Sequence, residues 1–322
     1  MSALAPLFRF LSPPGARARL SILIFHRVLS ALDPLFPDLP DAERFDKILR
    51  WMKSWFNVLP LDQAVRQLAT GTLPARAAAI TFDDGYADNF TVALPILRRR
   101  ELAATFFIAT GFLDGGRMWN DTIIEAIRQC RSPVLDLRDI ALGHHALSIP
   151  HERRAAIEML IAGAKYLPAD QRNALAERIA ERAGVEPPTD LMMSSQDVQQ
   201  LRHAGMQIGA HTISHPMLTK LTSEDSRSEI AEGKARLEDL LQERIGLFAY
   251  PNGKFGKDYV EEHATMVREI GFDAAVSTDW GAASRNSDFM QLPRFTPWDN
   301  NRFFFAARLG ANLVGARRPG DG

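Results

Sequence analysis

Short apolar runs alternate along the chain with longer stretches whose apolar residues recur at helical spacing. Six runs have the length and composition of buried strands: residues 20–25, 78–82, 103–109, 206–210, 247–250 and 272–277. Four stretches have helical spacing: residues 45–56, 89–100, 223–243 and 259–270. Strands that alternate with helices indicate βα units and a parallel sheet. The order therefore predicts an α/β fold, a closed or nearly closed barrel with its chemistry at the carboxyl ends of the strands.

The segment from about residue 119 to 193 interrupts this alternation. It contains amphipathic helical patterns at 151–166 and 169–183 and no strong strand. We interpret it as a helical insertion in one βα connection of a single catalytic domain, 1–322, whose barrel core spans about 20–310. The insertion either shapes substrate access at the barrel mouth or only covers apolar barrel surface. The tail at about 315–322 consists mostly of Gly, Pro and Arg and is predicted to be disordered.

Composition excludes several classes of protein. Of the 322 residues, 46% are hydrophobic and 24% are charged, which is typical of a globular chain. The 38 basic residues against 39 acidic ones argue against binding to nucleic acid, which needs an excess of positive charge. Because Cys130 is the only cysteine, an intrachain disulfide and a cysteine-only zinc site are excluded. Any metal must be bound by histidines and carboxylates.

The apolar runs give no sign of stable membrane insertion. All are far shorter than the roughly 20 residues that cross a bilayer. The first eleven residues are interrupted by Pro6 and Arg9 and lack the pattern of a secretion signal. We therefore expect a cytoplasmic protein. Its oligomeric state is not predicted.

Polar clusters follow two of the expected strands. Asp83 and Asp84 come directly after residues 78–82 and precede Gly85, and His211 and His215 follow residues 206–210 with i, i+4 spacing. Alone, the aspartates could cap a helix and the histidines could be ordinary surface residues. Together they offer a two-histidine, one-carboxylate metal site with open coordination positions.

A third cluster, residues 248–253, ends an expected strand and turns sharply at Pro251 and Gly253. Backbone N–H groups in such a turn are free to point at an anion. A plain turn is the alternative interpretation.

These residues resemble those of a known family. The sequences at 81–85 (TFDDG) and 211–216 (HTISHP) match the first two motifs of the polysaccharide deacetylases in full. These are metal-dependent carbohydrate esterases, which include chitin, peptidoglycan and chitooligosaccharide deacetylases. The resemblance covers about residues 20–295 and implies a distorted barrel, usually with seven strands, and thus a distorted (β/α)7-type barrel here.

The resemblance also implies roles for individual residues. Asp83 would be the general base that activates the attacking water. Asp84, His211 and His215 would hold a divalent metal, with Zn²⁺ the usual occupant.

Substrate contacts are implied in the third and fourth motifs. Asn252 stands where the family often has a tyrosine whose backbone N–H binds the oxyanion, a role that does not need the tyrosine side chain. Tyr250, in the same turn, and Trp280, a partial match to the fourth motif, complete the predicted substrate-binding set.

Two family residues are absent. Ala249 stands where an arginine often pairs with the catalytic aspartate, and residues 292–294 lack the histidine that often acts as general acid. We assign the acid to His26, which follows the first expected strand, because an unperturbed histidine titrates near pH 6.5. A histidine that only bonds a neighbouring loop is an equally open alternative. Arg294 is assigned to pair with Asp83 and keep it ionised.

The expected function is metal-dependent hydrolysis of N-acetyl groups from an amino-sugar polysaccharide, an oligosaccharide or its precursor. Alternatives are a related amidase on a small non-sugar substrate and a non-catalytic carbohydrate-binding relative. A non-haem iron oxygenase could use the same ligands. The paired aspartates fit a hydrolytic water better.

Overall fold

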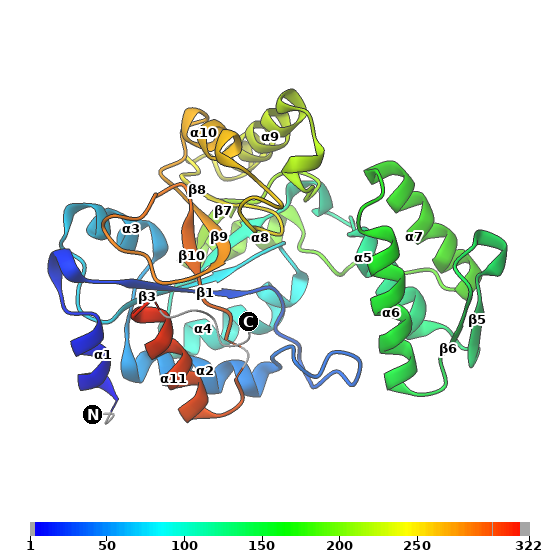
Figure 1. Cartoon of the computed structure of the whole chain (residues 1–322), viewed down its shortest axis with the longest axis horizontal. Coiled ribbons are helices and arrows are strands. Elements are labelled where there is room, and N and C mark those ends of the chain that lie inside the picture. The colour runs from blue at the N-terminus through cyan, green and yellow to red at the C-terminus, as the bar shows by residue number, and fades with distance from the viewer. Residues whose placement is uncertain (1–3, 298, 316–322) are drawn as a thin grey trace.

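Seven parallel strands form the centre of the computed structural model, which describes residues 4–297 and 299–315 (Figure 1). They are β1 (Leu20–Phe25), β3 (Ala77–Phe82), β4 (Thr105–Ile108), β7 (Gln207–Ala210), β8 (Leu247–Ala249), β9 (Ala274–Trp280) and β10 (Leu292–Arg294), hydrogen-bonded in that order. The short β2 (Asn57–Val58) pairs with β3. After β10, Phe295 N donates to Ile22 O at 2.7 Å and Phe295 O accepts from Ile24 N at 3.0 Å. The sheet is thus a nearly closed barrel, as predicted.

Helices surround this barrel. They are α1 (Ala5–Leu11), α2 (Ala42–Trp55), α3 (Leu61–Thr70), α4 (Leu94–Arg100), α8 (Ser195–His203), α9 (Ser223–Leu241), α10 (Glu261–Glu269) and α11 (Arg302–Leu313). The predicted helices at 45–56, 89–100, 223–243 and 259–270 correspond to α2, α4, α9 and α10, with a π-helical turn, Asn89–Ala93, directly before α4. Asp41 and Thr222 accept hydrogen bonds from backbone N–H groups and so cap α2 and α9.

Residues of each strand alternate between two apolar layers. In β3, Ala77 and Ala79 belong to a cluster made largely of other strand residues and α3, whereas Ala78 and Ile80 pack in a cluster shared with most outer helices. The first cluster is the barrel interior, because successive strand residues point to opposite faces. The same alternation directs Asp83, just past β3, toward the interior.

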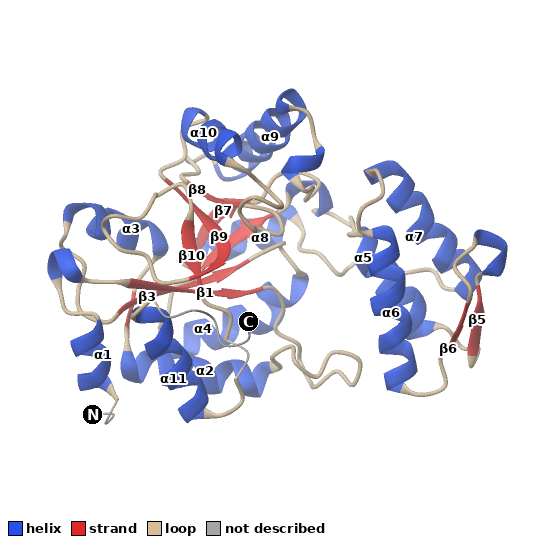
Figure 2. Ribbon diagram, viewed as in Figure 1, coloured by secondary structure: helices blue, strands red, loops and turns tan. Residues whose placement is uncertain are grey.

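In the sequence, the insertion comes between β4 and β7, and in space it lies beside the barrel (Figure 2). It contains α5 (Trp119–Gln129), α6 (Pro150–Ala164) and α7 (Ala169–Ala183), which share an apolar cluster separate from those of the barrel. It also contains an antiparallel pair, β5 (Val134–Asp136) and β6 (His144–Ala146), which the sequence did not predict. Asp136 in β5 and His144 and His145 in β6 interrupt any apolar run, so neither strand gives the signal of a buried strand.

Two contacts join the insertion to the loop after β3. Met193 N donates to Gly85 O at 2.9 Å near the end of the insertion. Near its start, the buried Tyr86 hydroxyl donates to Asp121 Oδ2 at 3.1 Å. The insertion is therefore anchored at the carboxyl end of the barrel strands, next to the predicted site.

In the described part of the chain, no helix has the length and apolar composition needed to cross a membrane. The tail predicted to be disordered lies, beyond Gly315, outside the described residues.

Candidate active site

Asp84, His211 and His215 meet at the carboxyl ends of β3 and β7. Asp84 Oδ1 lies 3.4 Å from His211 Nε2 and 3.3 Å from His215 Nε2. The three ligand atoms lie within 4.8 Å of one another. Asp84 and His211 are buried, while His215 is partly exposed. The structure thus brings together the three residues predicted to hold a metal.

The backbone of these loops adopts an unusual conformation to bring the side chains together. Asp84, Thr212 and His215 have positive φ angles of 78°, 64° and 56°. Side chains other than glycine rarely adopt this region, and such residues concentrate at functional sites. The three positive φ angles therefore concentrate on residues of the predicted metal site.

Glu229, on α9, holds the histidine loop in this conformation. Its carboxylate accepts hydrogen bonds from Ile213 N and Ser214 N at 2.9 Å and from Ser214 Oγ at 2.6 Å. Gly233, one turn further along α9, allows close approach, since a Cβ there would lie 2.9 Å from backbone atoms of Thr212. Sequence reasoning did not identify Glu229, because a glutamate on a polar helix has no distinguishing local signal.

The arrangement of the Asp84, His211 and His215 side chains favours a cation bound between them. His211 Nδ1 lies 2.7 Å from the carbonyl oxygen of Ala249, which fixes the proton on Nδ1 and leaves the Nε2 lone pair facing Asp84. Asp84 Oδ1 is buried and has no hydrogen-bond partner within the described residues. Two lone pairs directed at each other repel unless a positive charge lies between them. The residues therefore fit a divalent cation.

The protonation of the site agrees with this fit. Burial lowers the pKa of His215 to about 4 despite the nearby Asp84, so this imidazole is neutral at neutral pH. Burial would raise the pKa of Asp84, but the surrounding histidines lower it well below its usual range. For His211, burial is outweighed by Asp84 and Asp83, and its pKa is raised. A bound cation would take the place of that proton.

Asp83 and Arg294 form a buried ion pair inside the barrel. Arg294 Nη1 and Nη2 donate to Asp83 Oδ1 and Oδ2, both at 2.7 Å, and each residue is 2% exposed. Arg294 Nε also donates to Ser277 O at 2.7 Å. Burial would raise the pKa of Asp83, but the arginine charge outweighs it and the pKa lies below its usual value. Arg294, the last residue of β10, thus occupies the position against Asp83 that was expected of it.

His26 and Asn252 line two different cavities. His26 is exposed directly after β1, and its charge helps to lower the pKa of Asp83 and Asp84. Asn252 lines the same cavity as Asp84 and has a φ of 59°. Its backbone N–H donates to no acceptor within the residues that the structure describes. The turn is held by Thr278, whose hydroxyl donates to Asn252 O at 2.8 Å.

Two predicted substrate-binding residues are not brought to this cavity. The Tyr250 ring is buried and stacks on Tyr259 with ring centres 3.8 Å apart, and its hydroxyl donates to Met290 O at 2.9 Å. Trp280 packs against Phe295 at 5.0 Å. The side chain of Tyr250 is thus part of the core. The reason is that successive residues of a strand point to opposite faces. Ala249 packs in the inner cluster, so Phe248 before it and Tyr250 after it pack in the outer cluster.

The cavity at the site has a volume of about 210 Å³ and extends to the insertion. Its lining includes Asp84, His215 and Asn252 from the barrel, and Trp119, Lys165 and Arg172 from the insertion. Sequence reasoning missed the last three. One signal was available: Arg172 lies on the buried face of α7, four residues before the buried Ala176.

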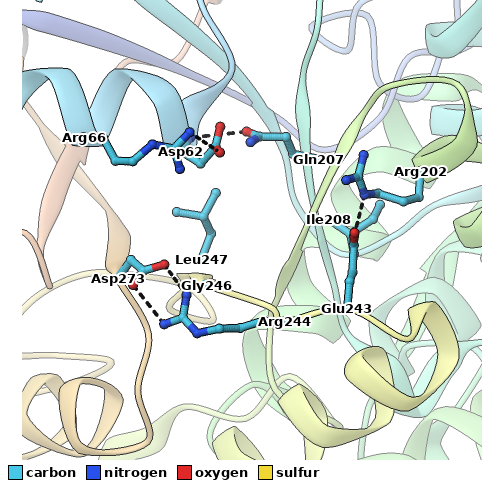
Figure 3. Close-up of a pocket in the computed structure, with 10 residues that line it drawn as sticks. All are labelled: Asp62, Arg66, Arg202, Gln207, Ile208, Glu243, Arg244, Gly246, Leu247 and Asp273. Carbon is cyan, nitrogen blue, oxygen red and sulfur yellow. Dashed lines mark hydrogen bonds and ion pairs between the residues drawn. The ribbon is translucent and has the colours of Figure 1, made fainter.

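A second cavity, of about 200 Å³, lies at the other end of the barrel (Figure 3). Its charged residues pair with one another: Arg66 with Asp62 at 2.8 Å, Arg244 with Asp273 at 2.6 Å, and Arg202 with Glu243. It is lined by Gln207 and Leu247, which begin their strands. We place the chemistry at the first cavity, since barrel enzymes act at the carboxyl ends of their strands.

Comparison with known proteins identifies the family. The model of the polysaccharide deacetylase family matches residues 70–156 and 168–274, more than half of the chain. The chain therefore belongs to the polysaccharide deacetylase family. It is a hydrolase of carbon–nitrogen amide bonds that removes acetyl groups from polysaccharide.

Individual relatives are distant. YxkH of Bacillus subtilis (strain 168), which is assigned as a polysaccharide deacetylase, is 22% identical over 279 residues, covering 86% of this chain and 71% of YxkH. The Streptococcus pyogenes deacetylase PplD in complex with acetate has a TM-score of 0.60 and 18% identity, covering 94% of this chain and 99% of PplD. IcaB from Ammonifex degensii has a TM-score of 0.58 and 17% identity, covering 94% and 98%. These structures share the barrel fold.

Proposed function

We propose that the protein is a metal-dependent N-deacetylase that hydrolyses the acetamido group of an amino sugar, with Zn²⁺ as its ion. The observation that carries this proposal is the unpaired, buried Oδ1 of Asp84, which faces Nε2 of two histidines beside an ionised Asp83. The resemblance to PplD, which was determined with acetate, agrees with acetate as the product.

A divalent cation held by Asp84, His211 and His215 would supply Lewis acidity for the amide carbonyl and the attacking water. Asp83 accepts the proton of that water. Arg294 holds both carboxylate oxygens of Asp83, which keeps the base ionised and fixes its orientation. Asp83 is thus ionised, and able to accept a proton, over the whole neutral range of pH.

Two further residues complete the proposed reaction. The backbone N–H of Asn252, in the turn after β8 that lines a cavity together with Asp84, stabilises the oxyanion that forms during attack. His26, exposed directly after β1, donates a proton to the departing amine. The amide C–N bond then breaks, and acetate and the free amino sugar leave.

An acetate-release assay on a panel of acetylated amino sugars tests this proposal. The full-length protein is stripped of metal and then loaded with Zn²⁺, Co²⁺ or Mn²⁺. We expect release of one acetate for each free amine formed, only in the loaded enzyme. Release that is unaffected by stripping would contradict metal dependence. Loaded protein that binds the sugars without releasing acetate would indicate a carbohydrate-binding relative.

The cytoplasmic location stays a prediction, which fractionation of producing cells would test. The division of the chain into one catalytic domain with an insertion is likewise part of the proposal. Replacing the insertion with a short loop should change which sugar is preferred more than it changes metal content.

A further inference from the structure

Two basic side chains on the insertion line the active-site cavity without an acidic partner. Arg172, on α7, is 9% exposed. Within the described part of the chain, its guanidinium forms no hydrogen bond and no ion pair, and its Nε is fully buried. Lys165, directly after α6, lines the same wall and also forms no ion pair among those residues. An arginine this deeply buried is normally paired.

Packing inside the insertion does not account for Arg172. Its guanidinium stacks over the ring of Trp119 at 5.0 Å. Stacking engages the flat face of the group, whereas its five N–H donors point outward along the edge and stay unused. Burial lowers the pKa of Arg172, and no carboxylate opposes this shift. The nearby Arg117 contrasts with it, because Arg117 pairs with Glu177 at 3.0 Å.

The cavity itself offers no counter-charge. Asp84 is the only carboxylate among the ten residues that line it, and its Oδ1 faces the two histidines. The barrel residues of the cavity thus carry the candidate hydrolytic site. The insertion residues of the same cavity carry two uncompensated positive charges, Arg172 and Lys165.

We propose that Arg172 and Lys165 form an anion-binding subsite, and that the acetylated amino sugar bound here carries a carboxylate or phosphate group. The proposal rests on the proposed deacetylase function, since it places the acetamido group of the same ligand at the Asp84 end. A planar guanidinium matches the two oxygens of either anion, and a flexible lysine adds a second donor. Anion binding also supplies the hydrogen-bond acceptor that Arg172 lacks.

Calorimetric binding of three sugars to the full-length protein tests this subsite without requiring turnover. The probes are N-acetylglucosamine, N-acetylglucosaminuronic acid and N-acetylglucosamine 6-phosphate. At least one anionic sugar should bind about tenfold or more tightly than the neutral one, the difference expected for a charged hydrogen-bonded pair. The stronger of the two identifies the anion as carboxylate or phosphate.

Variants connect the preference to the residues. Arg172→Gln should abolish the preference for the anionic sugar and leave the Kd of the neutral sugar within about twofold, and Arg172→Lys should retain part of it. Lys165→Gln, at a partly exposed position, should reduce the preference and remains informative if Arg172→Gln fails to fold. The matched control is Arg178→Gln, which removes the same charge from an exposed position of the same helix.

The outcomes separate this subsite from the proposed reaction. Anionic and neutral sugars that bind equally, or anionic sugars that do not bind at millimolar concentration, would overturn the subsite even if acetate is released. A preference lost equally in Arg178→Gln would overturn it too, because any positive charge of α7 would then suffice. A preference that depends on Arg172 in a protein that releases no acetate would uphold the subsite and overturn the deacetylase.

Discussion

The two ends of the barrel both carry a cavity of about 200 Å³ with charged walls, yet their charges are arranged in opposite ways. At the amino end of the strands, Arg66, Arg202 and Arg244 each pair with a neighbouring carboxylate (Figure 3). At the carboxyl end, Asp84 Oδ1 has no hydrogen-bond partner and Arg172 has no counter-charge within the described residues.

This difference distinguishes charged groups that stabilise the fold by pairing with each other from charged groups whose partner would be a ligand. A buried polar group without a partner costs free energy, so it persists where something outside the chain compensates it. Size and charge alone therefore do not distinguish an active site from a salt-bridged groove.

The largest effect is expected from the metal ligands. Asp84→Ala and His215→Ala each remove one of three ligand atoms, so metal content should fall to a small fraction of the wild-type value and acetate release to background. Elemental analysis of the purified variants measures the loss. Full occupancy in both variants would show that the ion is bound elsewhere.

Next, Asp83→Asn should lower kcat/KM by about two to four orders of magnitude, the usual contribution of a general base. Because Asp83 does not belong to the ligand triad, metal content should remain near that of the wild type. Measuring rate and metal on the same sample distinguishes a base from a ligand. An active Asp83→Asn enzyme would exclude Asp83 as the base.

His26→Ala should lower kcat by about 100-fold, the lower end of what a general acid contributes, because His26 is exposed. An acid must be protonated to act, so activity supported by a histidine falls as pH rises above its pKa. The variant should therefore lose the basic limb of its pH–rate profile and keep its metal. A basic limb that persists would assign the proton to another group.

Arg294→Ala should move the acidic limb of the profile to higher pH and lower activity at neutral pH about tenfold. Without the arginine, burial is no longer outweighed and the pKa of Asp83 rises. In the wild type, the lowered pKa adds stability that is present above about pH 4, the unfolded value, and is lost as pH falls further. Urea unfolding at pH 3 and pH 7 should show this dependence in the wild type and less of it in the variant.

The smallest effect is expected at the amino end of the barrel. Asp273→Asn breaks the exposed pair with Arg244, which should cost less than about 1 kcal/mol of stability and change kcat/KM less than about twofold. It serves as the matched control for Asp83→Asn, since both remove the carboxylate of a bidentate arginine pair. A large loss of activity would mean that the two ends of the barrel are coupled.

Local patterns in the sequence were sufficient to predict the main strands of the barrel. Each of the six predicted strands overlaps an observed one, because a continuous apolar run is a signal that needs no distant contact. The strands β5, β6 and β10 are not continuous apolar runs, because each contains a polar residue: Asp136 in β5, His144 and His145 in β6, and Arg294 in β10. The motifs around Asp83 and His211 were likewise readable, since strand ends and metal-ligand spacing are local properties.

Tertiary structure decided how side chains from distant segments meet. The pair of Arg294 with Asp83, across 211 positions of sequence, was predicted, but its two parallel hydrogen bonds inside the barrel are a property of the folded chain. Tyr250 and Asn252 are neighbours in one turn, yet one ring packs in the core and the other residue lines the cavity.

The sequence by itself determined the parallel barrel, the strand ends that carry chemistry and the residues suited to a metal, because each depends on neighbours along the chain. Only the folded chain placed Arg172 and Lys165 in the same cavity as Asp84. Their position depends on how the insertion packs against the barrel, and such packing is the sum of many weak contacts between residues far apart in sequence.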